Sequence, residues 1–404
     1  MPPANSKKQL LESFARTTDE IFSLKEFEEL LGSKKKIRIK YGVDVTSPFL
    51  HIGHAVNLWM MRELQDLGHK VIFLIGDFTT QIGDPTGRSN IRPIIPQEEI
   101  DKNAEEFIRQ AKMVLRFDDP ELLEIRRNSE WFAGYQLSDF LKLLSMVTHA
   151  RLISRDMFQR RIEGQEDIYL HEMIYPILQG YDSYALESDL TIIGSDQLFN
   201  EMLGRFYQQK LGQNPQVIIT TKITQGIDGK AKQSKSLDNY IGLGHSPRDK
   251  FGRCMKIPDN LIVDYLKIYT KVPIKEVSKI EKDVNFDPMK CKKFLAEEII
   301  KRYHDEASAK NEREWFENTF SKKITPEDIP VLELDCSEWI AINLVDKFFN
   351  DSRSKSDVRR LFQQGAVSIN SQKISSFDSR IKVSTDDIVK VGKRTWFKIK
   401  IVNS

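Results

Sequence analysis

The sequence of 404 residues predicts an α/β protein with a doubly wound parallel sheet, followed by a helical region and a small C-terminal module. Residues 36–43 alternate charged and apolar side chains as a strand does, a helical pattern runs from about His54 to Gly68, and the apolar run VIFLIGD follows at once. The buried-type runs DLTIIGS and QVIITTK, near residues 192 and 218, supply later strands. Strands joined by helices lie parallel, so ligands are expected at their carboxyl ends.

Four segments are expected along the chain. The charged helical stretch Asn103–Val114 is inserted between the early and late strands of the first domain. Beyond Arg248 the pattern is helical and polar on one side, and a stretch with two prolines and no sustained period then precedes the C-terminal module. The predicted division is a sheet domain at 1–245, a helical domain at 246–322, a linker at 323–336 and a compact domain at 337–404.

Composition argues against a membrane protein, a secreted protein and a protein held by disulfides or zinc. Hydrophobic residues make up 40% and charged residues 30%, and no apolar run approaches the roughly 18 residues that a membrane span requires. The first residues lack the apolar core of a secretory signal, so a cytoplasmic protein without a membrane partner is expected. Cys254, Cys291 and Cys336 are far apart, which argues against a disulfide framework and against a zinc site; no protein metal site is expected.

Charge is segregated to the C-terminal end. Residues 337–404 contain 13 Lys and Arg against 7 Asp and Glu, a net charge of +6, whereas the whole chain carries only +2. A small basic module on a mildly acidic body suggests a polyanionic partner, because phosphate contacts depend on the density of cations.

The first motif with chemical potential is His51-Ile52-Gly53-His54, where the first strand gives way to its helix. A helix N-terminus offers free backbone N–H groups, Gly lets the backbone approach a nucleotide, and two imidazoles can donate to phosphate oxygens. Isolated histidines also serve as structural residues, so this motif alone leaves ATP chemistry open.

The second motif, Lys232-Gln233-Ser234-Lys235-Ser236, follows about 180 residues later in a polar loop opened by GIDG. Two lysines spaced by three, with a small hydroxyl residue between them and another after, suit a mobile clamp that neutralises the charge developing on a leaving pyrophosphate. A solvated basic loop is the alternative for the motif taken alone. Its combination with the first motif favours ATP chemistry.

Together these motifs resemble the HIGH and KMSKS signatures of class I aminoacyl-tRNA synthetases. Further runs resemble the tyrosyl-tRNA synthetases, in their bacterial branch: GDFTTQIGDPTGRS, YPILQGYDSYAL, IGSDQLFN and SKSLDNYIGL. The resemblance covers nearly the whole chain. It implies a Rossmann-like catalytic domain, ATP as a substrate that arrives with Mg²⁺, L-tyrosine and tRNA(Tyr) as partners, and a homodimer. The implied reaction makes tyrosyl-adenylate and then transfers tyrosine to the 3′ end of the tRNA.

The resemblance also assigns residues to tyrosine. Asp84, Tyr175 and Gln179 would surround its ammonium group, and Asp182 would face its phenolic hydroxyl. A carboxylate there would be left unpaired by phenylalanine, and such rejection through a required hydroxyl is a known property of this family. Taken singly, Asp84 could be a turn carboxylate and Tyr175 a core aromatic. The full implied tyrosine-binding set is Tyr41, Asp84, Tyr175, Gln179, Asp182 and Gln197.

ATP receives its own implied set. Asp196 would hold the ribose, Gln197 would lie near the tyrosine carboxylate, and Asp44 with Thr46 would complete the nucleotide cradle. The implied ATP-binding residues are Asp44, Thr46, His51, Gly53, His54, Asp196, Lys232, Ser234 and Lys235, and the implied catalytic residues are His51, His54, Lys232 and Lys235. In-line attack of the tyrosine carboxylate on the α-phosphate needs no covalent enzyme intermediate.

Three positions depart from the family pattern. Gln233 stands where Met is usual and Val45 where Pro is usual, and neither change removes a charged group. Many tyrosyl enzymes also place a Tyr two residues before the Gly of the first strand, to contact the substrate hydroxyl. Here Gly42 is preceded by Lys40 and Tyr41, so either residue could reach the phenol.

The basic tail resembles an S4 RNA-binding module over residues 352–374, which makes the C-terminal domain small, α+β and S4-like. Gly365 would permit the turn before the strand AVSIN. The residues expected to face RNA phosphate are Ser354, Lys355, Arg359 and Arg360, although a solvated charged face is the alternative for any one of them.

Three other functions compete with this interpretation. A tryptophanyl-type enzyme would place Asp182 beside a substrate whose only donor is an indole N–H, which suits it poorly unless the carboxylate is reoriented. A catalytically degenerate RNA-binding paralogue would not need His51, His54, Lys232 and Lys235. A nucleotidyltransferase that adenylates another acceptor would not need the RNA module.

Overall fold

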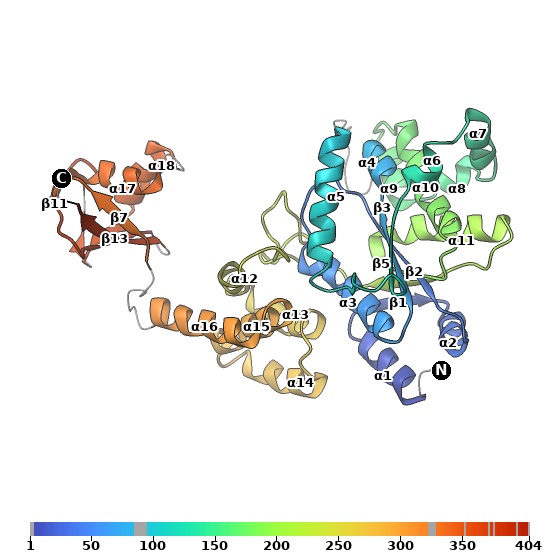
Figure 1. The fold of residues 1–404 in the computed structure, drawn as a ribbon, viewed down its shortest axis with the longest axis horizontal. Helices are drawn as coiled ribbons and strands as arrows, with labels where there is room; N and C mark the ends of the chain where they lie inside the picture. Colours follow the sequence, from blue (N-terminus) through green and yellow to red (C-terminus); the bar gives the residue numbers. More distant parts are fainter. Residues whose placement is uncertain are drawn as a thin grey trace. The chain divides into compact units, whose positions relative to one another are not determined.

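The computed structural model describes residues 4–84, 95–321, 329–350, 353–370, 372–374, 376–392 and 395–402. The chain divides into two compact units, Met1–Arg313 and Glu314–Ser404, and each is described by itself (Figure 1).

The first unit is built on a six-stranded sheet in the order β1-β6-β5-β2-β3-β4. Only β1 is antiparallel to its neighbour. The chain moves outward from β2 to β3 and β4 on one side and to β5 and β6 on the other, which confirms the doubly wound parallel fold. The strands are β1 Thr18–Phe22, β2 Arg38–Val43, β3 Lys70–Ile75, β4 Leu123–Arg127, β5 Leu190–Gly194 and β6 Val217–Thr221.

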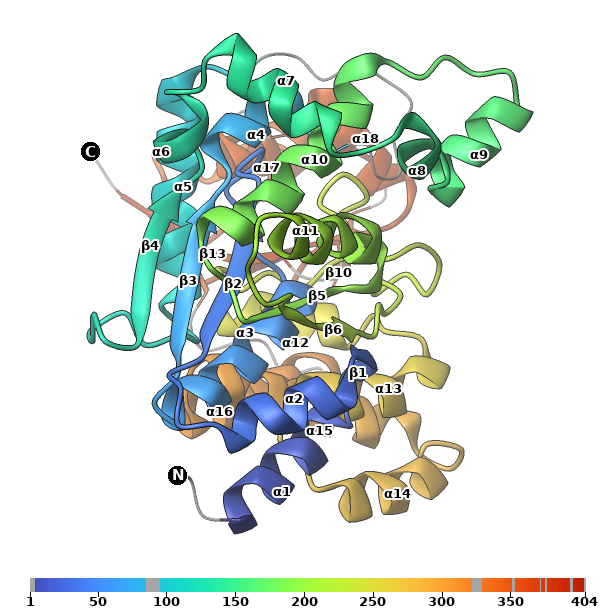
Figure 2. The ribbon, with the colours of Figure 1, turned by 90° about the vertical axis from the view of Figure 1, so that its right-hand side faces the viewer.

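The four strands predicted from the sequence are β2, β3, β5 and β6, and they are the four inner strands of the sheet, with β1 and β4 at its edges. Their side chains are mostly buried because helices cover the sheet; Figure 2 shows α10 and α11 beside β2 and β5. Lys40 and Tyr41 are neighbours on β2, so they face opposite sides of the sheet.

Helices surround this sheet. They are α1 Ala4–Phe14, α2 Leu24–Gly32, α3 Ile52–Asp66, α4 Asp77–Ile82, α5 Gln97–Ala111, α6 Ser129–Phe132, α7 Leu137–Ser145, α8 His149–Ile153, α9 Asp156–Glu163, α10 Leu170–Ala185 and α11 Leu198–Lys210, with the 3₁₀ turn Ser195–Gln197 before α11. The helix expected from about His54 to Gly68 is α3, and the one expected at Asn103–Val114 is α5, which begins six residues earlier because Gln97 follows Pro96.

Residues 246–321 of the domain expected to be helical are largely helical. They contain α12 Pro247–Cys254, α13 Ile262–Tyr269, α14 Ile274–Asp283, α15 Pro288–Tyr303 and α16 Glu306–Phe316, with a 3₁₀ turn at Asp259–Leu261 and a π-helical turn at Glu317–Ser321. Contacts join these helices to the sheet as far as Arg313. The boundary predicted at residue 245 therefore remains a prediction.

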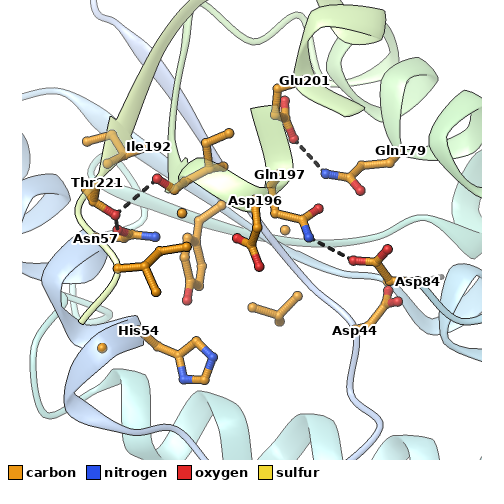
Figure 3. A pocket seen from close by; sticks show the side chains of 18 of the residues that line it. Asp44, His54, Asn57, Asp84, Gln179, Ile192, Asp196, Gln197, Glu201 and Thr221 are labelled. Carbon is orange, nitrogen blue, oxygen red and sulfur yellow. Dashed lines mark hydrogen bonds between the residues drawn. The ribbon is translucent and has the colours of Figure 1, made fainter. Parts of the chain in front are cut away.

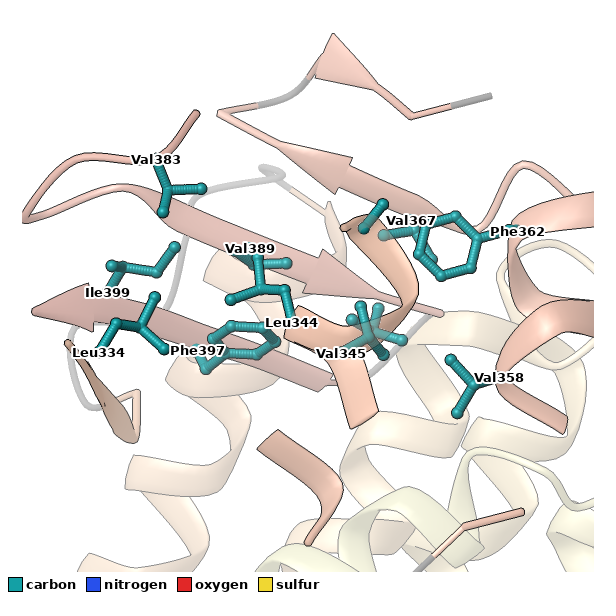
Figure 4. Packing of buried hydrophobic residues seen from close by; sticks show 12 residues of the cluster. Leu334, Leu344, Val345, Val358, Phe362, Val367, Val383, Val389, Phe397 and Ile399 are labelled. Carbon is teal, nitrogen blue, oxygen red and sulfur yellow. The ribbon is translucent and has the colours of Figure 1, made fainter. Parts of the chain in front are cut away.

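The C-terminal unit is a small α+β domain, as expected. A five-stranded sheet has the order β10-β9-β12-β13-β7, and β11 pairs with β8. Two helices pack on it, and Figure 4 shows Leu344 and Val345 beside Val389 and Phe397, and Phe362 beside Val367, in one buried cluster. The elements are β7 Val331–Leu334, β8 Glu338–Ile340, α17 Ala341–Phe349, α18 Lys355–Gln363, β9 Val367–Ile369, β10 Gln372–Lys373, β11 Arg380–Lys382, β12 Ile388–Val391 and β13 Thr395–Ile401.

Part of the predicted linker is wrong. Residues 331–334 form β7, which pairs in parallel with β13, and Leu334 is buried in the core of the unit. Four residues next to a proline carry too short a pattern to predict a strand. Residues 323–328 of the predicted linker lie outside the described residues. Gly365, by contrast, adopts the expected turn conformation between α18 and β9, with φ of 62°.

Candidate active site

A cavity of about 430 Å³ lies where β2 and β5 end, at the point from which the sheet is wound in both directions (Figure 3). It brings together residues from β2, α3, α10, α11 and the loop after β6. Among the residues singled out from the sequence, those that line it are Lys40, Tyr41, Asp44, Thr46, His51, Gly53, His54, Asp84, Tyr175, Gln179, Asp182, Asp196, Gln197, Lys232 and Gln233.

The two histidines form the N-terminal cap of α3. His51 Nδ1 accepts from the Gly53 N–H at 3.1 Å, and His54 Nδ1 accepts from the His51 N–H at 3.2 Å, which leaves Nε2 of each ring as the protonated nitrogen. The ring centroids are 3.7 Å apart. Burial lowers the pKa of His54 to about 4, with Asp196 opposing and Lys232 adding to the shift. Burial, His54 and Lys232 lower the pKa of His51 well below its usual value.

Gly53 is required for this arrangement. A Cβ at this position would lie 2.8 Å from His51 Nδ1, closer than side chains approach. The glycine therefore lets the His51 ring fold back over the helix terminus. The pair presents two neutral N–H donors at a helix N-terminus, which suits an anionic ligand without placing a full charge there.

One wall of the cavity carries linked carboxylates and amides. Tyr175 donates to Asp44 at 2.9 Å, and burial followed by Asp44 raises the pKa of Tyr175 well above its usual value. Asp84 accepts from Gln197 at 2.8 Å. Asn200, which was not singled out from the sequence, donates to Gln197 and to Gln179 at 3.0 and 2.7 Å. This wall suits an ammonium group, because it presents acceptors and negative charge.

Asp182 lies deep in the cavity on α10. It is 3% exposed and accepts from Trp131 Nε1 at 3.0 Å and from Asn128 Nδ2 at 3.4 Å. Burial raises the pKa of Asp182 to about 8, against the opposing effect of Lys40. Neither Trp131 nor Asn128 was predicted from the sequence. They fix both carboxylate oxygens in place.

Lys40 and Tyr41 both line the cavity, from opposite faces of β2. Lys40 Nζ lies 2.8 Å from Glu201 Oε2 and 2.7 Å from Ser183 Oγ, and both Lys40 and Glu201 are 2% exposed. Tyr41 instead packs against Phe73, with ring centroids 5.6 Å apart. Lys40 is thus the residue on the side of α10 and α11, where Asp182 lies.

The two lysines of the loop after β6 lie in different surroundings. Lys232 Nζ lies 2.8 Å from Asp196 Oδ2 at the cavity, with side chains 57% and 30% exposed. Lys235 is not in the cavity lining; its Nζ lies over the Phe49 ring at 3.9 Å from the centroid. Ser234 is also outside the lining, and its hydroxyl is hydrogen-bonded to that of Ser236.

Gln233 anchors the loop between these lysines. It is 7% exposed, donates to the Tyr269 hydroxyl at 2.8 Å and accepts from the Ile241 N–H at 3.3 Å. The substitution of the usual Met therefore adds polar contacts to α13. Ile241 in turn accepts from the Ile52 N–H at 2.9 Å, which joins the loop to the start of α3.

The four residues expected to face RNA lie on or next to α18 in the C-terminal unit. Ser354 caps the helix by accepting from the Asp357 N–H at 3.2 Å and donating to its carboxylate at 2.7 Å. Arg360 lies 3.6 Å from Asp357, and its side chain is 65% exposed. Lys355 lies 3.9 Å from Asp346 and is 71% exposed. The guanidinium of Arg359 lies over the ring of Phe377.

The rest of the described chain shows no competing metal centre. Cys254 and Cys291 are buried and Cys336 is exposed, each as a free thiol. Among the described residues, no group of three or more His, Cys, Asp or Glu side chains could hold a metal ion. In this part of the chain no helix is both long and apolar enough to cross a membrane.

Comparison with known proteins agrees with this geometry. Residues 32–321 match the family model described as tRNA synthetases class I (W and Y). Tyrosine–tRNA ligase 2 of Photorhabdus laumondii is 41% identical, with 90% of this chain and 92% of the relative covered. The tyrosine–tRNA ligase of Thermotoga maritima is 39% identical, with 95% of both chains covered. That of Francisella tularensis is 40% identical, with 98% and 100% covered.

Two solved structures share the fold. The C-terminally truncated mitochondrial tyrosyl-tRNA synthetase of Aspergillus nidulans has a TM-score of 0.63 at 22% identity, with 77% of this chain and 93% of that chain covered. The tyrosyl-tRNA synthetase of Archaeoglobus fulgidus complexed with L-tyrosine has a TM-score of 0.59 at 22% identity, with 76% and 99% covered. The family model and the near-full-length relatives settle the assignment: the chain belongs to the class I tRNA synthetases of the tryptophanyl and tyrosyl family, among the bacterial-type tyrosine–tRNA ligases.

Proposed function

We propose that the chain activates L-tyrosine with ATP to form tyrosyl-adenylate and pyrophosphate, and then transfers tyrosine to the 3′ end of tRNA(Tyr). One observation carries the proposal: a single cavity joins a phosphate-type end, with the neutral histidine pair and Lys232, to a deep end with the buried carboxylate of Asp182. A nucleotide at the first end and an amino acid with a hydrogen-bonding side chain at the deep end would together match these groups.

At the phosphate end, the Nε2–H groups of His51 and His54 would donate to phosphate oxygens, and Lys232 would neutralise charge that develops on pyrophosphate. Asp196 would exchange its contact with Lys232 for the ribose hydroxyls. Lys235 would have to leave Phe49 to join this clamp, a loop movement that ATP would favour through new contacts. Ser234, Gly53, Asp44 and Thr46 would complete the nucleotide site.

At the other end, the tyrosine ammonium would meet Asp84, Tyr175 and Gln179, and Gln197 would lie near the carboxylate. The phenol would meet Asp182, with Lys40 rather than Tyr41 on the same side of the sheet. No residue needs to become covalently attached, because the tyrosine carboxylate attacks the α-phosphate directly and the site acts by positioning and by charge.

Magnesium would arrive on the phosphates of ATP, where it needs only one or two carboxylates from the protein. Asp44, Asp84 and Asp196 line the cavity and could supply such contacts, which fits an ion carried by the substrate better than a resident one. The reaction belongs in the cytoplasm, where ATP and tRNA are available.

The test of this function is ATP–pyrophosphate exchange with each of the twenty amino acids supplied separately. Exchange with tyrosine alone is expected. Exchange with tryptophan would favour the neighbouring branch of the family, and no exchange in folded protein would favour an RNA-binding paralogue. Deletion of the C-terminal unit should abolish aminoacylation and spare exchange, because Lys355, Arg359 and Arg360 are proposed to bind tRNA phosphates.

The histidines predict an unusual pH dependence. With the pKa of His54 at about 4, the pair stays neutral across the physiological range in the free enzyme, so kcat/KM for exchange should show no inflection near pH 6.5 from these rings. Between pH 6.5 and about 4 the unfolded chain binds a proton that the folded site does not, so stability should decrease as pH falls through this window. An inflection near 6.5 that disappears in His54→Asn would contradict the neutral pair.

We also propose a homodimer. Large apolar side chains are exposed within residues 137–170, among them Leu137 at 73% and Leu170 at 76%, and exposed apolar groups gathered in one segment suggest a protein contact. Leu137→Asp should shift the chain towards monomer in sedimentation equilibrium, and the new carboxylate at the start of α7 is favourable for the helix. Phe286→Asp, at an 88% exposed position elsewhere, is the control that should leave the mass unchanged.

A further inference from the structure

A second cavity, of about 370 Å³, shares no lining residue with the first. It lies between the end of α1, the middle of α3, the end of α13 and the end of α15; α1, α13 and α15 are seen in the lower part of Figure 2. The lining residues used below are Arg16, Trp59, Glu63, Lys267, Lys271 and Arg302. The proposed synthetase reaction assigns no role to any of them.

Charge in this cavity is unbalanced. Arg16, Lys267, Lys271 and Arg302 provide four cations against the single carboxylate of Glu63. Among the described residues, none of these four cations lies within 4.0 Å of a carboxylate oxygen, whereas many lysines and arginines elsewhere in the first unit have such a partner. Glu63 offsets part of this positive charge, and the surplus of cations that remains favours an incoming anion.

Two of the cations share one aromatic wall. The guanidinium of Arg302 lies 4.6 Å from the centroid of the Trp59 ring, and Lys271 Nζ lies 5.1 Å from it. Trp59 itself is held by a hydrogen bond from Nε1 to the Tyr303 hydroxyl at 3.3 Å. The ring therefore fixes both cations against the same side of the cavity.

Arg302 also retains an unused donor. Its Nε is buried and finds no hydrogen-bond partner among the described residues. Burial lowers the pKa of Arg302 and raises that of Glu63, so both groups are held in surroundings that disfavour their charged forms. A buried donor without a partner is rare in native proteins, so a water or a ligand atom is expected to accept from it.

Arg16 and Glu63 already form hydrogen bonds within the protein. Arg16 donates to the carbonyls of Lys267 and Leu266 at 3.1 and 3.3 Å, at the end of α13, and Glu63 accepts from Ser13 at 2.9 Å. Glu63 is not a hydrogen-bond partner of Arg302 Nε, which has none among the described residues. The geometry leaves Lys267, Lys271 and Arg302 as the groups that would hold an incoming anion.

We propose that this cavity binds a phosphate group. A tetrahedral oxyanion with several acceptor oxygens matches the surplus of cations, and a guanidinium is well suited to bind it. The volume exceeds what one phosphate ion fills, so there is room for a phosphate carried on a larger molecule. The same chemistry could come from inorganic phosphate or from the backbone of an RNA.

The first arm of the test counts inorganic phosphate bound by the full chain in equilibrium dialysis. Lys271→Met and Arg302→Met should each bind one phosphate fewer than the wild type, because any phosphate in the first cavity is common to all. Lys271 is exposed and makes no hydrogen bond to any described residue, so its substitution should leave the fold intact even if Arg302→Met fails to fold. The control is Lys275→Met, an exposed lysine on α14, which should bind as the wild type does.

The second arm identifies the source of the phosphate. With a tRNA transcript in filter binding, an RNA phosphate in the cavity predicts weaker binding by Lys271→Met and a salt slope reduced by about one, again unlike Lys275→Met. Unchanged RNA binding together with the loss of one phosphate would assign the site to small phosphates. Equal phosphate stoichiometry and equal RNA affinity in the wild type and both cavity variants would overturn the proposal.

Discussion

Replacement of Asp182 by alanine should reduce discrimination between tyrosine and phenylalanine by roughly 30-fold or more, about 2 kcal/mol, because the carboxylate is the buried acceptor proposed for the phenolic hydroxyl. Phenylalanine would leave Asp182 without that donor in a site where the carboxylate is only 3% exposed. Removal of the carboxylate removes this penalty. The measurement is kcat/KM for exchange with each amino acid, and tyrosine should lose far more than phenylalanine.

Asp182→Asn is the matched variant of similar size. In the native site Trp131 donates to one carboxylate oxygen and Asn128 to the other. An amide has one oxygen and one NH₂ group, so it must turn its NH₂ towards one of these donors and lose that contact. Selectivity should therefore fall in Asp182→Asn as well. Selectivity that survives both changes would remove Asp182 from the role of hydroxyl partner.

The inner strands were predictable because each is a continuous apolar or alternating run. The edge strand β4, with the sequence LEIRR, was missed because its half-exposed residues alternate with charges and resemble a surface loop. The edge strand β1, TDEIF, was missed for the same reason. An edge strand has one neighbour only, so its pairing depends on a strand that lies far away in the sequence.

The candidate site also contains both residues that the sequence could identify and residues that it could not. Residues in short motifs, such as His51 and His54, can be found because their contacts are local. The sequence could not show whether Lys40 or Tyr41 reaches the phenol. The answer depends on the contacts of Lys40 with Ser183, which is 143 residues away, and with Glu201. The only local signal was a lysine inside a buried strand, which requires a partner that the sequence does not identify.

The loop after β6 shows a further limit. Spacing predicted two lysines that act as one clamp, and the structure instead holds Lys232 on Asp196 and Lys235 on Phe49. The position of Gln233 between them follows from its contacts with Tyr269 and Ile241, which no pattern in the loop could indicate. A conformation that changes with ligand depends on the free energies of two states, and a single motif describes neither of them.

The structure therefore makes Lys232 the stronger test of the clamp. Lys232→Ala should slow adenylate formation by roughly 100-fold or more, because its charge would stabilise the leaving pyrophosphate in the transition state. Tyrosine affinity should change little, since the deep end of the cavity is untouched. Lys235→Ala should act in the same direction. Single-turnover formation of tyrosyl-adenylate, with tyrosine binding measured separately, gives both quantities.

The contact between Lys232 and Asp196 makes the expected result specific. Loss of Lys232 frees the Asp196 carboxylate, so the KM for ATP should stay near its original value or fall while the rate of the chemical step collapses. Lys230→Ala, an exposed lysine in the same loop, is the control and should leave both parameters unchanged. If Lys232→Ala instead raised the KM for ATP and preserved the rate at saturation, the lysine would bind ATP equally in the ground and transition states. The clamp would then have to rest on Lys235 and the histidine pair alone.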